Sequence, residues 1–226
     1  MLSGIKALLL DMNGTFMFGE DRFGEHEDFS LRYRELGGIL HPREINRIIR
    51  AAYEYLEVRY SNEKFRHCFP SLEQAIIEVA EEPLNESELE RVIGTFSYHE
   101  LGCIPKEYVS ALRRLRKRFT LAAVIDIWAP KKEWLIEFDR AGISGLFSAT
   151  SFSSDHGFVK PSPIPFKWVL DELELETTEA IMVGDSPRRD IGGARSAGIG
   201  CILVGGAKDP GALISLESLL QLCNAA

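Results

Sequence analysis

Four short segments of the chain combine carboxylates, a lysine and small residues in a pattern that suits phosphoryl transfer. They are Asp11-Met12-Asn13-Gly14-Thr15, Val124-Ile125-Asp126, Lys160-Pro161, and Gly184-Asp185-Ser186 followed by Asp190. Magnesium takes hard oxygen ligands and keeps several waters, so Asp11, Asp185 and one backbone carbonyl would make a sensible site for it. Lys160 would supply a point charge that offsets the phosphoryl oxygens. The residue types therefore predict a magnesium-assisted reaction at phosphorus.

Most of these segments follow apolar runs that are typical of strands buried on both faces. Between the later runs, apolar residues recur at helical spacing, as in Phe166, Val169 and Leu170. Strands that alternate with helices predict an α/β fold, a doubly wound Rossmann-like parallel sheet, which binds ligands at the carboxyl ends of its strands. The runs are Ile5–Leu10, Phe119–Ile125, Ala180–Val183 and Gly200–Val204.

The segment 16–104 has a different pattern, because its apolar residues recur at helical spacing and no strand-like run interrupts them. One stripe follows Pro42, which suits the first turn of a helix. Ser71 with Gln74 and Ser87 with Glu90 are typical capping boxes. We therefore expect an α/β core of residues 1–15 and 105–226 and an inserted, all-helical cap of residues 16–104. The stripe consists of Ile45, Ile48, Ile49, Ala52 and Leu56.

Composition narrows the possible classes of function. The 226 residues are 45% hydrophobic and carry a formal net charge of -8, which argues against nucleic-acid binding because phosphate backbones require clustered Lys and Arg. The four cysteines are scattered, which predicts reduced thiols and no structural zinc site. The apolar run before Asp11 is too short for a signal peptide or a membrane span. We expect a cytoplasmic protein that binds no membrane, and the oligomeric state stays open.

The order and spacing of the four segments resemble the haloacid dehalogenase superfamily. The similarity covers residues 1–15 and roughly 105–205, and the position of the helical insertion resembles the first cap type of that family. The resemblance implies a phosphohydrolase that acts on a small phosphorylated metabolite through an aspartyl-phosphate. It implies Asp11 as the nucleophile and Mg2+ held by Asp11, Asp185 and the carbonyl of Asn13, with Asp190 as a further candidate ligand. The implied residues around the phosphate are Thr15, Ile125, Asp126 and Lys160.

Two positions depart from the family pattern. Asn13 stands where most phosphatases of this type have a second Asp, and an amide cannot exchange protons near neutral pH. General acid-base groups contribute about 100- to 10,000-fold to rates. Ile125 and Asp126 stand where Ser or Thr would donate a hydrogen bond to phosphate. A binding or regulatory protein with little turnover is therefore the rival hypothesis. A dehalogenase is the weaker one, since halide displacement needs no metal site such as Asp185 and Asp190 suggest.

Several of these positions also have ordinary structural interpretations. Asp11 could be a polar strand terminus, Lys160 a solvated loop residue, and Asp190 a favourable charge at a helix N-terminus. Asp126 is expected to be a strand-end residue satisfied by backbone amides, with catalysis the lesser alternative. Aromatic residues at helical spacing usually belong to a core, although four of them could line a pocket; these are Tyr53, Tyr55, Tyr60 and Trp128. Arg22 and His26 are either exposed hinge residues or the entrance beneath the cap.

Overall fold

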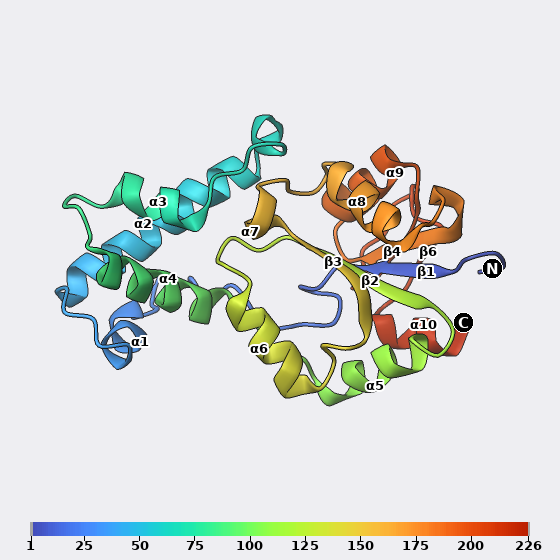
Figure 1. The fold of residues 1–226 in the computed structure, drawn as a ribbon, viewed down its shortest axis with the longest axis horizontal. Helices are drawn as coiled ribbons and strands as arrows, with labels where there is room; N and C mark the ends of the chain where they lie inside the picture. The colour runs from blue at the N-terminus through green and yellow to red at the C-terminus, as the bar shows by residue number, and fades with distance from the viewer. Residues whose placement is uncertain (1, 226) are drawn as a thin grey trace.

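A computed structural model describes residues 2–225 and contains one six-stranded sheet in the order β3-β2-β1-β4-β5-β6. All neighbouring strands are parallel, and β1 lies between β2 and β4 near the centre (Figure 1). The predicted α/β, doubly wound parallel fold is confirmed. The strands are β1 (Ala7–Leu10), β2 (Thr120–Ile125), β3 (Phe147–Phe152), β4 (Ala180–Gly184), β5 (Gly200–Leu203) and β6 (Ile214–Ser215).

Helices cover both faces of the sheet, so that alternate residues of β1 enter different apolar clusters. Leu8 and Leu10 belong to the cluster that includes residues of α5, α6 and α10, whereas Ala7 and Leu9 belong to the cluster with α8 and α9. A strand that is buried on both faces needs apolar residues at successive positions, which explains the continuous apolar run at the start of the chain. The core helices are α5 (Lys106–Leu115), α6 (Lys132–Ala141), α7 (Ser153–His156), α8 (Ile164–Leu173), α9 (Gly192–Ala197) and α10 (Leu219–Ala225).

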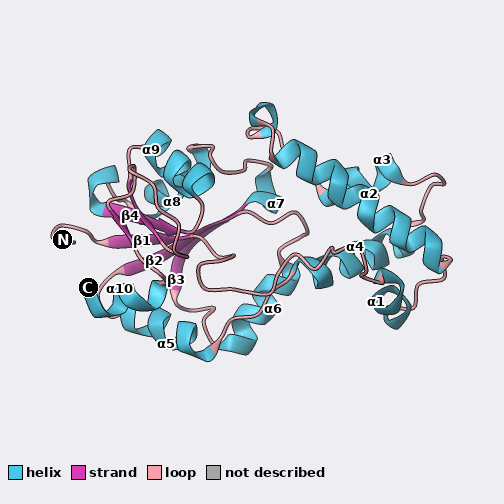
Figure 2. Ribbon diagram, turned by 180° about the vertical axis from the view of Figure 1, so that it is seen from behind, coloured by secondary structure: helices cyan, strands magenta, loops and turns pink. Residues whose placement is uncertain are grey.

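Four further helices gather at the opposite end of the molecule from the sheet (Figure 2). The five apolar residues of the stripe after Pro42 are all fully buried on α2, as their spacing predicts. The capping box of Ser71 and Gln74 is present at the start of α3. The box predicted at Ser87 is wrong, because Asn85 caps α4 by accepting a hydrogen bond from the Glu88 N–H. These helices are α1 (Phe29–Glu35), α2 (Pro42–Tyr60), α3 (Leu72–Val79) and α4 (Glu86–Glu100).

The chain passes between the sheet and these helices in two adjacent segments. Phe18 and Cys103 form an antiparallel bridge, in which each backbone N–H donates to the other residue's carbonyl at 2.9 Å. The bridge lies close to the expected cap boundaries of residues 16 and 104, which stay a prediction. Among residues 2–225, no helix is both long and apolar enough to span a membrane.

Candidate active site

The end of β1 places Asp11 beside two other strands. Leu10 pairs with Ala123 of β2 and with Val183 of β4, so polar residues that follow the three strands meet at one edge of the sheet. The Asp11 N–H donates to the Val183 carbonyl at 2.9 Å, which continues the sheet for one more residue. Beyond it, the Met12 carbonyl accepts from three N–H groups of the following turn. This compact turn holds Asp11, which is only 6% exposed.

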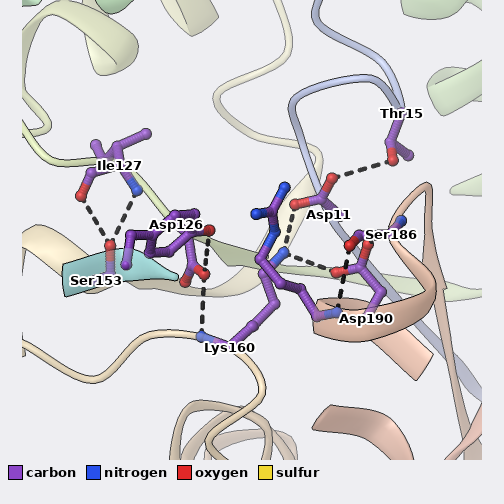
Figure 3. A network of polar contacts seen from close by, with 10 residues as sticks. Asp11, Thr15, Asp126, Ile127, Ser153, Lys160, Ser186 and Asp190 are labelled. Carbon is purple, nitrogen blue, oxygen red and sulfur yellow. Dashed lines mark hydrogen bonds and ion pairs between the residues drawn. The ribbon is translucent and has the colours of Figure 1, made fainter. Parts of the chain in front are cut away.

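Both oxygens of the Asp11 carboxylate are engaged by neighbouring side chains (Figure 3). Thr15 Oγ1 donates to Asp11 Oδ2 at 3.2 Å, and Lys160 Nζ lies 2.5 Å from Asp11 Oδ1. Lys160 Nζ also donates to Asp190 Oδ1 at 2.8 Å. Burial lowers the pKa of Lys160, but the carboxylates of Asp11, Asp190 and Asp126 outweigh it and raise the pKa overall. Lys160 is 3% exposed, so it is not the solvated loop residue of the alternative interpretation.

Two aspartates after β4 complete an acidic group with Asp11. One carboxylate oxygen from each of Asp11, Asp185 and Asp190 lies within 4.8 Å of the others. Asp190, in the π-helix η3 (Pro187–Ile191), is 1% exposed, and its Oδ2 accepts from the Ser186 N–H at 2.9 Å. Burial raises the pKa of Asp11 to about 7, with Asp190 and Asp185 adding to this effect and Lys160 opposing it. Burial and the Asp190 carboxylate likewise raise the pKa of Asp185.

Glycine creates the space that the Asp185 carboxylate occupies. A Cβ atom on Gly14, which has a φ of +70°, would lie 2.3 Å from Asp185 Oδ2. Unlike Asp11 and Asp190, Asp185 forms no ion pair with any described residue. Its carboxylate and that of Asp11 are hard oxygen donors crowded together by the fold, which is the donor set that Mg2+ requires. The residues present therefore fit a magnesium ion.

The remaining predicted site residues occupy different surroundings. Asn13 faces the same cavity as Asp11, and its side-chain Oδ1 is buried without a hydrogen-bond partner among the described residues. Ile125 is 1% exposed in an apolar cluster and does not line the cavity, whereas Asp126 does. Asp126 Oδ2 accepts from the Lys160 N–H at 3.0 Å and from the Tyr60 hydroxyl at 2.8 Å. One backbone amide thus satisfies Asp126, as expected, together with a phenol from α2.

The loop after β2 is held in place on both sides of Asp126. Ser153 Oγ donates to the Ile127 carbonyl at 2.8 Å and accepts from the Ile127 N–H at 2.9 Å (Figure 3). The next two N–H groups, of Trp128 and Ala129, donate to the two oxygens of Glu100 at the end of α4, at 2.6 and 2.9 Å. Asp126 is therefore presented to the cavity from a rigid loop.

These residues surround a cavity of about 250 Å³ between the sheet edge and α2. Tyr53, Tyr60 and Trp128 line it, whereas Tyr55 does not. Arg22 donates instead to the carbonyls of Gly19, Leu101 and Tyr98, and neither it nor His26 lines the cavity. Five residues that line the cavity were not predicted from the sequence: Glu20, Asp21, Glu57, Glu100 and Arg189. Of these, Glu57 could have been found from the sequence, because it lies between Tyr53 and Tyr60 on one face of a helix.

Comparisons with known proteins agree with this geometry. The profile of the haloacid dehalogenase-like hydrolases matches residues 5–198. A phosphoserine phosphatase of Thermus thermophilus is 30% identical over 162 residues, which cover 68% of this chain and 64% of that protein. A glyceraldehyde 3-phosphate phosphatase of Pyrococcus furiosus is 34% identical over 110 residues, 47% of this chain and 45% of that protein. The matched parts thus span less than two thirds of either relative.

Solved structures share the whole fold at lower identity. A HAD phosphatase from Thermococcus onnurineus has a TM-score of 0.64 at 22% identity and covers 98% of this chain and 97% of its own. A 2-haloacid dehalogenase from Pseudomonas syringae also has a TM-score of 0.64 at 22% identity and covers 97% of each chain. Identities this low show the fold alone. Through the profile match over residues 5–198, however, the chain belongs to the haloacid dehalogenase-like hydrolases.

Proposed function

We propose that the protein is a Mg2+-dependent phosphohydrolase that acts on a small phosphate monoester through a covalent intermediate on Asp11. The observation that carries the proposal is the buried group of Asp11, Lys160, Asp185 and Asp190 at the edge of the sheet, open to a cavity of small-molecule size. The names of the two relatives, both phosphatases of small phosphorylated compounds, support the same class of reaction.

In the first step, a carboxylate oxygen of Asp11 attacks phosphorus, the bond to the ester oxygen breaks, and the alcohol leaves. Lys160 holds Asp11 in place and offsets the charge on the phosphoryl oxygens. Thr15 fixes the other oxygen of Asp11, so the carboxylate is oriented before the substrate arrives. Asn13 cannot protonate the leaving oxygen, so water must supply that proton.

In the second step, water attacks phosphorus, the bond to Asp11 breaks, and inorganic phosphate and a proton are released. We propose that Asp11, Asp185 and the carbonyl oxygen of Asn13 hold the Mg2+. When bound, this ion neutralises phosphoryl oxygens as a Lewis acid. Asp190 accepts hydrogen bonds from Lys160 and from the Ser186 N–H, so it positions the lysine, and its carboxylate also lies within reach of an ion held by Asp11 and Asp185.

Release of phosphate from a panel of monoesters and acyl phosphates, with and without Mg2+, tests the proposal. The panel includes phosphoserine and glyceraldehyde 3-phosphate, on which the relatives' names are based. We expect Mg2+-dependent release that the Asp11→Asn variant abolishes. The rival function, a phosphate-binding protein without turnover, is motivated by Asn13. It becomes the better description if the wild type binds phosphate esters in Mg2+ but releases phosphate from none.

A further inference from the structure

Acidic side chains outnumber basic ones on the walls of the cavity beside Asp11. Eight carboxyl side chains and two basic side chains line it. Lys160 is already paired with Asp11 and Asp190, and the Arg189 guanidinium lies 4.9 Å from the centre of the Tyr60 ring. A magnesium ion held by Asp11 and Asp185 would offset the charge of these residues and of nearby Glu20, but not that of Asp21 and Glu57. A phosphate dianion would therefore meet net repulsion unless the rest of its molecule carries positive charge.

The surplus charge lies on three further carboxyl groups of the cavity, namely Glu20, Asp21 and Glu57. Glu20 is half-buried and close enough to Asp185 for that carboxylate to raise its pKa, whereas Asp21 and Glu57 are exposed. None of them forms an ion pair with another described residue, and Glu20 Oε2 is buried without a hydrogen-bond partner. Burial raises the pKa of Asp21 to about 6, and the carboxylates of Glu20 and Glu57 add to this effect. The three groups are thus close enough to repel one another, and the Arg189 guanidinium offsets this repulsion only in part.

An aromatic wall stands beside these carboxylates. The ring centres of Tyr53 and Tyr60 lie 5.3 and 5.6 Å from that of Trp128. Tyr53 and Glu57 are one helical turn apart on α2, and burial together with Asp21 and Glu57 raises the pKa of Tyr53. Aromatic faces attract organic cations, above all quaternary and alkyl ammonium groups. Carboxylates and aromatic rings on the walls of one small cavity form a surface that is complementary to such a group.

Resting on the proposed phosphohydrolase function, we propose that the substrate is a small phosphate monoester that carries an organic ammonium group. Glu20, Asp21 and Glu57 bind the cation, with Tyr53 and Trp128 as its aromatic contacts, while the phosphate lies at Asp11. A sugar or polyol phosphate has no group that these carboxylates attract. Phosphoserine brings a second anionic group along with its amine, so it fits less well than an aminoalkyl phosphate without a carboxylate.

Matched pairs of substrates change the charge while keeping the shape, and the carboxylate variants below separate binding of the charge from its effect on the leaving group. Choline phosphate and 3,3-dimethylbutyl phosphate have the same shape but differ by one positive charge, and 2-aminoethyl phosphate and propyl phosphate form a smaller pair. We expect kcat/KM in Mg2+ to be about tenfold or more higher for the charged member of at least one pair, since ion-pair and cation–π contributions combine. Equal values within both pairs, or higher values for the neutral members, would overturn the inference.

Variants of the carboxylates then locate the preference. Asp21→Asn and Glu57→Gln should each lower the charged-to-neutral ratio of kcat/KM, by up to about fivefold for a partly solvated pair. Glu54→Gln is the matched control, because Glu54 is an exposed residue of the same helix that does not line the cavity. If Glu54→Gln lowers the ratio as much as Glu57→Gln does, the preference comes from net charge and the proposed binding site is wrong.

Acetyl phosphate separates this inference from the proposed function. If Asp11-dependent hydrolysis of acetyl phosphate occurs in Mg2+ but neither ester pair shows a preference, the ammonium inference fails and the proposed function stands. If neither acetyl phosphate nor any of the four esters is hydrolysed, the proposed function fails. Calorimetric binding of choline phosphate and 3,3-dimethylbutyl phosphate to the wild type in Mg2+ then decides the inference, which requires the choline ester to bind about tenfold more tightly.

Discussion

Asn13 can support the binding of a phosphate ester but cannot carry out the proton transfer that hydrolysis of the ester needs. Its backbone stays available as an oxygen ligand whatever the side chain is, but its amide cannot donate or accept a proton near neutral pH. The side-chain Oδ1 faces the cavity, buried and without a hydrogen-bond partner among the described residues. Leaving groups that need no protonation should therefore react best, and the aspartyl-phosphate should persist because no base activates the attacking water.

Replacing Asn13 with Asp should restore that proton transfer. The new carboxyl would lie among the acidic residues of the cavity, which raise its pKa and suit it to act as an acid. We expect Asn13→Asp to increase kcat on an alkyl phosphate by about tenfold or more and to change kcat on acetyl phosphate much less. Steady-state phosphate release gives kcat for the two substrates. Rapid-quench measurement gives the amount of covalent intermediate that accumulates.

The Asn13→Ala variant is the control for the loss of the amide itself. It should not gain turnover on the alkyl phosphate, since it restores no proton donor. If Asn13→Asp leaves the rate unchanged while Asp126→Asn abolishes turnover, the acid-base function belongs to Asp126 instead.

Some site residues were predictable from the sequence and others were not, for a physical reason. Asp11, Lys160 and Asp185 follow strands or lie in short motifs, and the order of parallel strands brings their ends to one edge. Glu100 reaches the cavity because its carboxylate accepts from the loop after β2, and Glu20 because the next residue, Asp21, donates to the Glu100 carbonyl. Contacts of this kind depend on tertiary structure and leave no periodic pattern in the chain.

At the scale of elements, one hydrogen bond joins α2 to the end of β2. The Tyr60 hydroxyl donates to Asp126 Oδ2, and burial followed by the Asp126 carboxylate raises the pKa of Tyr60 far above its ordinary value. Burial also raises the pKa of Asp126, while Lys160 and the Tyr60 hydrogen bond oppose this effect. The bond therefore stabilises a buried carboxylate and ties the helices of residues 29–100 to the sheet.

A double-mutant cycle with Tyr60→Phe and Asp126→Asn measures this connection. Hydrogen bonds to charged groups contribute about 1.5 to 3 kcal/mol, so we expect a coupling free energy of unfolding in that range. Tyr60→Phe keeps the ring contact with Trp128, so the cycle reports the hydroxyl alone. Additive effects of the two substitutions, measured by urea unfolding, would mean that the contact contributes nothing to stability.

Glu100 forms the second connection, from the end of α4 to the loop after β2. Its side chain is 3% exposed and accepts from two backbone N–H groups, yet burial raises its pKa from 4.5 to about 8, with Asp21 contributing. Between these two pKa values the folded state binds a proton that the unfolded chain has lost. The stabilising contribution of this group is therefore complete below pH 4.5 and is lost as the pH rises toward 8.

The Glu100→Gln variant cannot titrate at position 100, so comparing it with the wild type isolates the pH-dependent contribution of Glu100 to the free energy of unfolding. We expect the free energy of unfolding of the wild type, relative to the variant, to fall steadily between about pH 5 and pH 8 and to level off above. Urea unfolding of both proteins at several pH values in this window gives the difference, in which the other titrating groups largely cancel. A difference that is independent of pH would mean that Glu100 is ionised throughout.

Strands that are buried on both faces could be predicted from the sequence, and the other strands could not. β1, β2, β4 and β5 are buried on both faces and read as apolar runs, so the sequence revealed them. β3 lies at the edge of the sheet, and Ser148 and Thr150 are exposed on it, so no apolar run marks the strand. The two-residue β6 is too short for any pattern. Edge strands and short strands are defined by their partners rather than by their own residues.

At the scale of the whole molecule, the charge of the cavity and the net charge have the same sign. The chain carries a formal charge of -8, and carboxylates outnumber basic residues around the cavity. A phosphate dianion therefore approaches against a repulsive field, and only Lys160, Arg189 and a metal ion attract it once it has entered. Such a field acts on association and depends strongly on ionic strength, because dissolved salt screens it over about 10 Å at 0.1 M and 3 Å at 1 M.

Salt should accordingly affect the two kinds of substrate differently. For a phosphate ester without a cation, such as propyl phosphate, we expect kcat/KM at saturating Mg2+ to increase by about two- to fivefold between 0.05 and 0.5 M NaCl, because screening removes repulsion. For choline phosphate the same salt weakens the attraction of the ammonium group, so its kcat/KM should rise less or fall. Initial rates at low substrate concentration, with the Mg2+ activity held constant, measure both slopes. A decrease of kcat/KM for propyl phosphate with salt would require a positively charged approach, contrary to the acidic entrance inferred from Glu20, Asp21 and Glu57.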